Sequence, residues 1–224
     1  ALDHHGVQVR REAYLPMLGE SLLRYRLKTW GQVSVPVLFA PGVTLTDSYD
    51  IAKWADGQGS GQSLRTSEPE VQQWNARAMS VLSAGRLRTT ARVASDPQAL
   101  LESCPPPLDK LGKFALPIAK LGARFIAHKY SFDSATLAQH GDTMVDGLDA
   151  LTKALGDGQY VLDDFSYADI VMAASLAFVE PVEDRYIRLG PSSRRQWTDP
   201  DLAERYRALT EWRDTIYDRH RRRR

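Results

Sequence analysis

Cysteine and histidine, whose side chains often serve in nucleophilic catalysis and metal binding, are few in this sequence. Cys104 is the only cysteine, and the histidines are His4, His5, His128, His140 and His220. None of these residues falls at the spacing of a metal site. Cys104 precedes Pro105 and Pro106 within a helical region, so we interpret it as a structural thiol. The sequence therefore predicts no metal and no internal disulfide, and the simplest compartment is a reducing one.

Two short polar motifs mark helix starts. Ser48 precedes the apolar residues Ile51 and Trp54, which predicts that its hydroxyl caps a helix. Ser166 and Asp169 have the spacing of a capping box, in which each side chain bonds the other residue's backbone N–H. The segment that follows, residues 170–179, is apolar on every side, so we expect a buried helix. We assign Ser166 and Asp169 a structural role.

Charged and glycine-rich segments have alternative interpretations. Arg86, Arg88 and Arg92 lie on one long helix, where Arg88 and Arg92 are four residues apart and share a face. A solvated face is our preferred interpretation. The glycines at residues 57–61 suggest a dinucleotide loop, but they follow a helix and the third glycine of that motif is absent. A flexible linker fits better.

The predicted secondary structure changes along the chain, from mixed strands and helix in the first part to helices alone in the rest. Residues 7–11, 33–39 and 43–45 have strand-like patterns, the last two joined by a turn at Pro41-Gly42. Residues 20–30 have a helical pattern, with Leu22, Leu23, Leu27 and Trp30 on one side. Helical patterns then occupy residues 67 to beyond 92, about 108–125, 137–155 with Gly156 at the end, 170–179, and a last helix from Asp199-Pro200 to Ile216.

Bulk composition is that of a globular protein. Hydrophobic residues make up 43% and charged residues 25% of the 224 residues, and the formal net charge is +1. Four arginines at residues 221–224 supply part of that charge, so the body sits near −3 (1 − 4). This charge balance does not indicate a nucleic-acid-binding protein. No stretch of the sequence has the length of a membrane span or the form of an export signal. We expect a cytoplasmic protein without a nucleic-acid or membrane partner.

Three segments together resemble the glutathione-transferase family. Val35-Pro36-Val37-Leu38 is similar to that family's V-P-x-L strand. Residues 45–51, LTDSYDI, resemble its L-x-E-S-x-A-I segment, with Asp47 in place of Glu and Asp50 in place of Ala. Residues 165–170, FSYADI, resemble its F-S-x-A-D-I segment, and residues 209–214 are similar to the end of many bacterial members.

The resemblance implies a two-domain fold. Residues 1–56 would be part of a thioredoxin-like glutathione-binding domain, residues 57–66 a linker, residues 67–220 an all-helical domain, and residues 221–224 a basic tail. Glutathione would pair with the backbone of Val35 beside a cis Pro36. Its γ-glutamyl carboxylate would bind Ser48 at a helix N-terminus, and its ammonium would face Asp47.

The same resemblance implies the activity and assembly. Glutathione would be the co-substrate, added to an electrophile in detoxification, with peroxidase or thiol exchange as variants. Arg88 and Arg92 fall where the family lines its electrophile site, and members form homodimers.

The family's catalytic residue has no counterpart in this chain. Residues 1–6 resemble the end of the family's first helix, so its first strand and its catalytic Ser, Tyr or Cys would precede them. We therefore expect an incomplete version of a longer parent, with the catalytic residue unknown. The alternative is a non-catalytic binding or scaffold protein with the same fold, which Asp50 and the missing strand favour.

Overall fold

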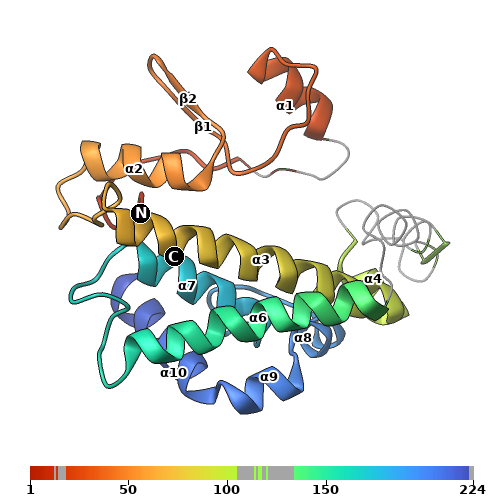
Figure 1. The fold of residues 1–224 in the computed structure, drawn as a ribbon. Coiled ribbons are helices and arrows are strands. Elements are labelled where there is room, and N and C mark those ends of the chain that lie inside the picture. Colours follow the sequence, from red (N-terminus) through yellow and green to blue (C-terminus); the bar gives the residue numbers. More distant parts are fainter. Residues whose placement is uncertain are drawn as a thin grey trace. The chain divides into compact units, whose positions relative to one another are not determined.

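The computed structural model describes residues 1–12, 14, 19–104, 114, 116–117, 120 and 134–221. The chain divides into two compact units, Ala1–Glu68 and Pro69–Arg224. Figure 1 shows the first in red to orange and the second in yellow to blue. The helix predicted at about residues 108–125 lies largely outside the described residues. Among the described residues, no helix has the length and apolarity to cross a membrane.

The first unit is built around a hairpin and two helices. Its elements are α1 (Gly19–Leu27), β1 (Leu38–Ala40), β2 (Val43–Leu45) and α2 (Ser48–Gln58). β1 and β2 are antiparallel, with Leu38 opposite Leu45. The turn between them contains Gly42 with φ +73°, a conformation that favours glycine. The predicted hairpin is confirmed, but β1 is only the end of the expected strand.

One prediction for the first unit is wrong, and another, the helix at residues 20–30, is confirmed only over Gly19–Leu27. Residues 7–11 form no strand, because no described strand lies beside them to complete a hydrogen-bonded ladder. In α1 only Leu23 is buried, whereas Leu22 is 62% exposed and Trp30, beyond the helix, is 98% exposed. The expected apolar face therefore lacks cover in the described part of the chain.

The second unit is helical. It contains α3 (Pro69–Ser95), α4 (Pro97–Glu102), α6 (Ser134–Leu155), α7 (Tyr167–Ser175), the 3₁₀ helix η2 (Leu176–Phe178), α8 (Pro191–Trp197), α9 (Pro200–Arg205) and α10 (Arg207–His220). α6 matches the predicted periodicity, and it ends at Gly156, whose φ is +48°. α4 and α8 are short helices that the sequence analysis did not identify.

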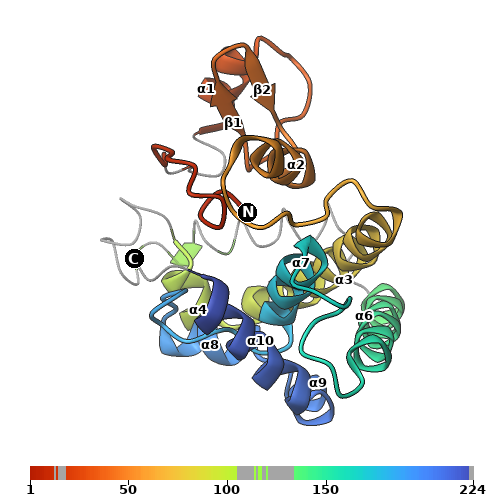
Figure 2. The same ribbon diagram turned by 90° about the vertical axis from the view of Figure 1, so that its left-hand side faces the viewer.

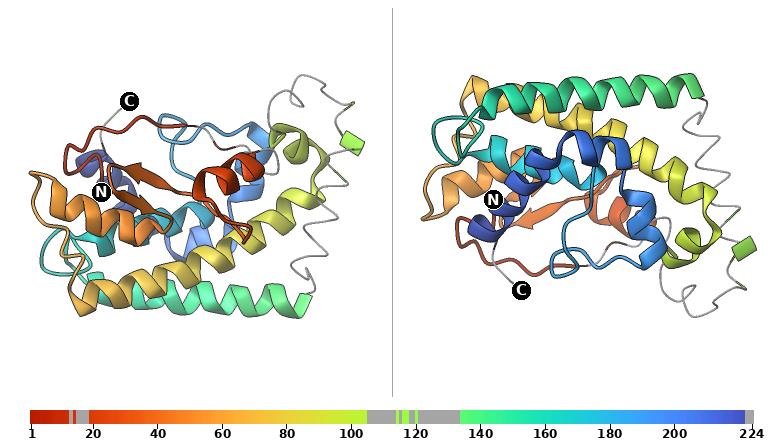
Figure 3. Two further views of the ribbon diagram at one scale, coloured as in Figure 1. Left: turned by 90° about the horizontal axis from the view of Figure 1, so that it is seen from above. Right: turned by 90° about the horizontal axis from the view of Figure 1, so that it is seen from below.

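The core of the second unit surrounds α7. This helix packs against α3 and α10, and α3 also packs along α6, as the views in Figures 2 and 3 show. Met172 and Leu176 are fully buried there. Glycines allow the close approach: a Cβ on Gly147 of α6 would collide with Val81 of α3, and one on Gly85 would collide with Phe178.

The predicted last helix is two helices. α9 ends at Arg205 and α10 begins at Arg207, and between them lies Tyr206, whose φ of −112° and ψ of 31° are not helical. The Tyr206 hydroxyl donates to Oδ1 of Asp149 on α6, at 2.6 Å. We infer that this contact with α6 fixes the position of the break.

Candidate functional site

The candidate site lies in the first unit, where the hairpin leads into α2. β2 contacts α2, so the hairpin places the start of the helix directly after it. α2 is anchored by its buried side: Ala52 and Ala55 are in the core, and the Tyr49 hydroxyl donates to the carbonyl of Thr66 at 2.6 Å. Burial raises the pKa of Tyr49, and the charge of Asp50 raises it further. The hydroxyl therefore stays protonated as a donor.

Asp47, rather than Ser48, is the N-cap of α2. Its Oδ1 accepts from the backbone N–H groups of Tyr49, at 2.8 Å, and Asp50, at 3.2 Å. This corrects the prediction that Ser48 caps the helix. Asp and Ser are equally good caps, and the chain places the first of the two at the non-helical position. Ser48 then becomes the first residue of the helix.

This cap leaves Ser48 available for a ligand. In the described part of the chain, no residue bonds to its backbone N–H or its hydroxyl, whereas the next two N–H groups are held by Asp47. The start of a helix also carries partial positive charge. Asp50 lies in this first turn with Lys53 3.6 Å away, so part of its negative charge is balanced.

Val35 and Pro36 precede β1 and are exposed. The peptide bond between them is cis, as the resemblance implies. Within the described residues, no backbone hydrogen bond involves Val35, so its N–H and carbonyl remain open to an extended peptide. Among the described contacts, no hydrogen bond joins Val35 or Pro36 to Asp47 or Ser48.

Arg88 and Arg92 are held inside the second unit. Arg88 Nη2 and Arg92 Nη1 lie 2.8 and 3.0 Å from Oδ2 of Asp199, which is also the N-cap of α9. Arg88 also donates to the carbonyl of Leu137 and Arg92 to that of Gln196. Burial lowers the pKa of Arg92.

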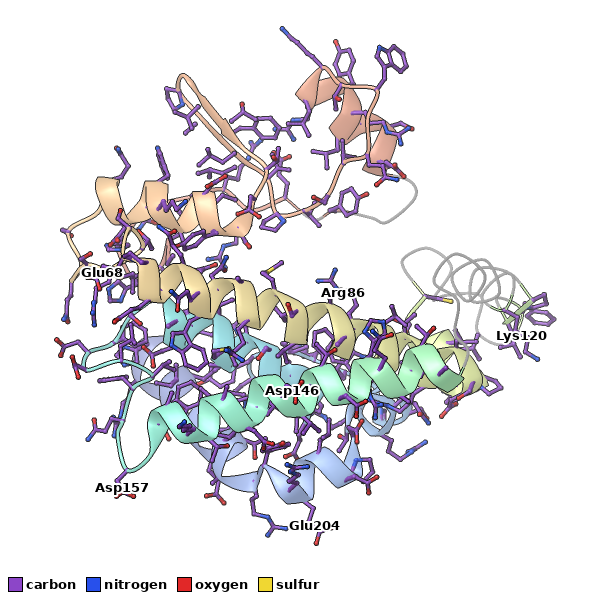
Figure 4. All side chains as sticks on the ribbon, viewed as in Figure 1. Glu68, Arg86, Lys120, Asp146, Asp157 and Glu204 are labelled. Carbon is purple, nitrogen blue, oxygen red and sulfur yellow. The ribbon has the colours of Figure 1, made fainter. Side chains whose placement is uncertain are left out.

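These bonds correct the expectation of a solvated face, because both arginine side chains are only 25% exposed. Their contact with an electrophile stays a prediction. Arg86, in contrast, is exposed and points away from α6 (Figure 4).

Ser166 and Asp169 form a capping box at the start of α7. Oδ2 of Asp169 accepts from the backbone N–H of Ser166 at 2.8 Å, and Oδ1 accepts from that of Val161 at 2.7 Å. Both side chains are completely buried. Burial raises the pKa of Asp169, while the hydrogen bonds from Val161 and Ser166 oppose that shift. The carboxylate joins α7 to the loop before it.

Comparison with known protein families identifies this helical region. Residues 134–215 match the family described as "Glutathione S-transferase, C-terminal domain". This match supports a glutathione S-transferase-like C-terminal domain in the second unit. No curated protein matches the chain. The matched segment runs from the start of α6 into α10, so it includes the capping box of Ser166 and Asp169 and the buried Asp199.

Cys104 and the histidines are the remaining candidates, and His128 lies outside the described residues. Cys104 is half-buried and its Sγ donates to the carbonyl of Leu100. Among the described residues, no group of three His, Cys, Asp or Glu side chains is arranged to hold a metal ion. Two contacts were not predictable from the sequence: Asp199 with the arginine pair, and Asp56 with His5. Each joins residues at least fifty positions apart, and no local pattern signals such a pairing.

Proposed function

We propose that this protein is a glutathione-transferase-like enzyme that adds the sulfur of glutathione to an electrophile. The observation that carries the proposal is the glutathione S-transferase C-terminal domain at residues 134–215. The first unit supports the proposal, because its hairpin is followed by α2, and no described residue bonds to the N–H or hydroxyl of Ser48 at the start of that helix. In this proposal the first unit is part of a thioredoxin-like glutathione-binding domain.

Glutathione binds by its main chain and by its acidic end. Its cysteinyl backbone pairs with the open N–H and carbonyl of Val35, next to Pro36. Its γ-glutamyl carboxylate accepts from the N–H and hydroxyl of Ser48, where the partial charge of α2 favours an anion. Asp47 uses Oδ1 for the helix cap, so Oδ2 faces the ligand's ammonium.

The chemistry is substitution or addition at an electrophilic carbon. The thiol loses its proton, the thiolate forms a C–S bond, and a leaving group, where present, departs with its electron pair. A thiol is mostly protonated at neutral pH, so the reaction needs a group that lowers the thiol pKa. We assign that role to no residue of this chain. We further propose that the assembly is a homodimer and that the electrophile binds near α3.

Binding is tested directly with glutathione. Isothermal titration of the chain with glutathione gives a saturable heat, and Ser48→Ala weakens the affinity by about tenfold, as loss of charge-assisted hydrogen bonds predicts. Ser60→Ala is the matched control, since Ser60 is an exposed hydroxyl in the same unit. Asp47→Asn keeps a capping side chain but removes the charge, so it weakens binding while α2 remains stable.

A rival function is favoured by Asp50, which places a second carboxylate beside the proposed anion site. In that case the fold serves as a non-catalytic binding or scaffold protein. Glutathione then gives no heat with the chain, and the Ser48→Ala variant behaves like the parent. Asp50→Ala separates the two ideas further, because removal of this charge strengthens glutathione binding only if the ligand carboxylate lies at the start of α2.

A further inference from the structure

The N-terminal turn packs on the glycine-rich segment after α2. Residues 2–7 close as a Schellman motif: the N–H of Val7 donates to the carbonyl of Leu2 at 3.0 Å, and that of Gly6 to Asp3 at 3.3 Å. Gly6 has φ +68°, the left-handed conformation that this motif requires. The turn thereby directs His4 and His5 against the rest of the first unit.

The glycines at residues 59 and 61 make room for these two histidines. A Cβ on Gly59 would collide with the side chain of His5, and one on Gly61 would lie 2.8 Å from the carbonyl oxygen of His4. His4 Nε2 lies 2.8 Å from the carbonyl oxygen of Gln62. The absence of side chains at Gly59 and Gly61 thus leaves space for the turn at residues 1–6, and the His5 side chain is completely buried there.

The carboxylate of Asp56 contacts both His5 of the turn and the segment that follows α2. Oδ1 of Asp56 lies 3.1 Å from Nε2 of His5 and accepts from the backbone N–H of Leu64 at 2.7 Å. Oδ2 accepts from the hydroxyl of Thr66 at 2.8 Å and that of Ser63 at 3.2 Å. Burial alone would raise the pKa of Asp56, but the bonds from Leu64, Thr66 and Ser63 lower it. Asp56 therefore remains ionised in mild acid.

His5 is poorly placed to carry a proton on both nitrogens. Neither Nδ1 nor Nε2 has a hydrogen-bond partner among the described residues, although Nε2 lies 3.1 Å from Oδ1 of Asp56. The neutral ring needs one donor position, whereas the protonated ring has two. Protonation would leave an N–H buried without an acceptor, and this is unfavourable.

We propose that the turn at residues 1–6 is an acid-sensitive latch on residues 59–66, and that His5 is the group whose protonation opens it. The evidence for the latch is the burial of the His5 side chain and the lack, among the described residues, of an acceptor for the second N–H of its protonated ring. It is independent of the proposed function, because none of its residues belongs to the proposed glutathione site.

The surrounding charges act in the same direction as burial, with one exception. Burial lowers the pKa of His5, the nearby His4 lowers it further, and Asp56 opposes them. Residues 59–61 contribute no titratable side chain. Since the pKa of His5 is lower in the folded state than in the unfolded state, its contribution to stability is complete above about pH 6.5. That contribution is lost as the pH falls toward the lowered value.

Hydrogen exchange followed by mass spectrometry tests the latch. After correction for the intrinsic rate, we expect exchange at residues 59–66 to rise between about pH 7.5 and about pH 5, by up to about tenfold for each unit by which the pKa is lowered. His5→Gln keeps a donor near Asp56 but does not titrate, so its exchange should not change with pH. His4→Gln is the matched control and should retain the full response.

Two outcomes would overturn the latch. One is exchange at residues 59–66 that is the same at both pH values in the parent chain. The other is a rise in His5→Gln equal to that of the parent. NMR titration of the His5 ring in the unmodified chain gives an independent measurement, which holds even if the variant folds poorly. The latch requires an apparent pKa below about 6.5, and a higher value contradicts it.

Discussion

Two buried carboxylates organise the helical unit at the level of single residues. Asp169 bonds within its own capping box and to Val161, only eight residues away. Asp199 caps α9 and also forms ion pairs with Arg88 and Arg92, which precede it by 111 and 107 residues. The first arrangement is visible in the sequence because every partner is local. The second is not, because it depends on how α3 packs against the segment before α9.

The role of Asp169 leads to a prediction about stability. Asp169→Asn keeps the size of the side chain but turns one acceptor oxygen into a donor, so either Val161 or Ser166 loses its bond. We expect the free energy of unfolding to fall by about 2–4 kcal/mol. Urea denaturation followed by circular dichroism measures the change. Asp164→Asn, at an exposed carboxylate in the same loop, should change stability by less than about 0.5 kcal/mol.

At the start of α2, the local sequence does not determine which residue caps the helix. Asp47 and Ser48 are adjacent and both favour the N-cap position, so local preference does not choose between them. The hairpin decides, because β2 ends at Leu45 and the chain reaches helical geometry only at Ser48. The correction matters for function, since it frees the Ser48 hydroxyl for a ligand and commits one oxygen of Asp47 to the helix.

At the level of elements, periodicity identifies helices better than it identifies breaks or strands. α6 and the hairpin follow from local signals, namely a regular apolar repeat and a Pro-Gly turn. The break at Tyr206 is marked by a hydrogen bond to Asp149, 57 residues away. The alternation at residues 7–11 predicts a strand, but a strand exists only with a neighbour, and the described chain provides none there.

Close helix packing predicts opposite effects for two identical substitutions. Gly147→Ala adds a methyl group that collides with Val81, so α3 and α6 must move apart, and we expect a loss of about 1–3 kcal/mol. Gly57→Ala in α2 meets no atom within 4 Å and improves helix propensity, so we expect a gain of about 0.5–1 kcal/mol. Thermal denaturation of both variants measures the difference. A neutral or stabilising Gly147→Ala would contradict the packing of α3 on α6.

At the level of the whole molecule, the two units differ in how completely each buries its apolar side chains. The second has a continuous core around α7, where the buried guanidinium of Arg213 donates to the carbonyls of Leu176 and Glu180. The first has a two-stranded ribbon, and large apolar side chains of it are exposed among the described residues: Leu22, Tyr25, Trp30, Val35 and Phe39. A two-stranded ribbon is marginal on its own.

This asymmetry predicts how the units behave when they are expressed apart. Residues 69–224 should give a helical circular dichroism spectrum and one cooperative thermal transition, because the core around α7 is built by helices of this unit. Residues 1–68 should unfold without a cooperative transition, since their buried side chains are few for a domain of that length. A cooperative transition in residues 1–68 would mean that the hairpin and α2 form a stable domain without further cover. Glutathione binding would then be measurable on that segment alone, which would separate the proposed site from the helical unit.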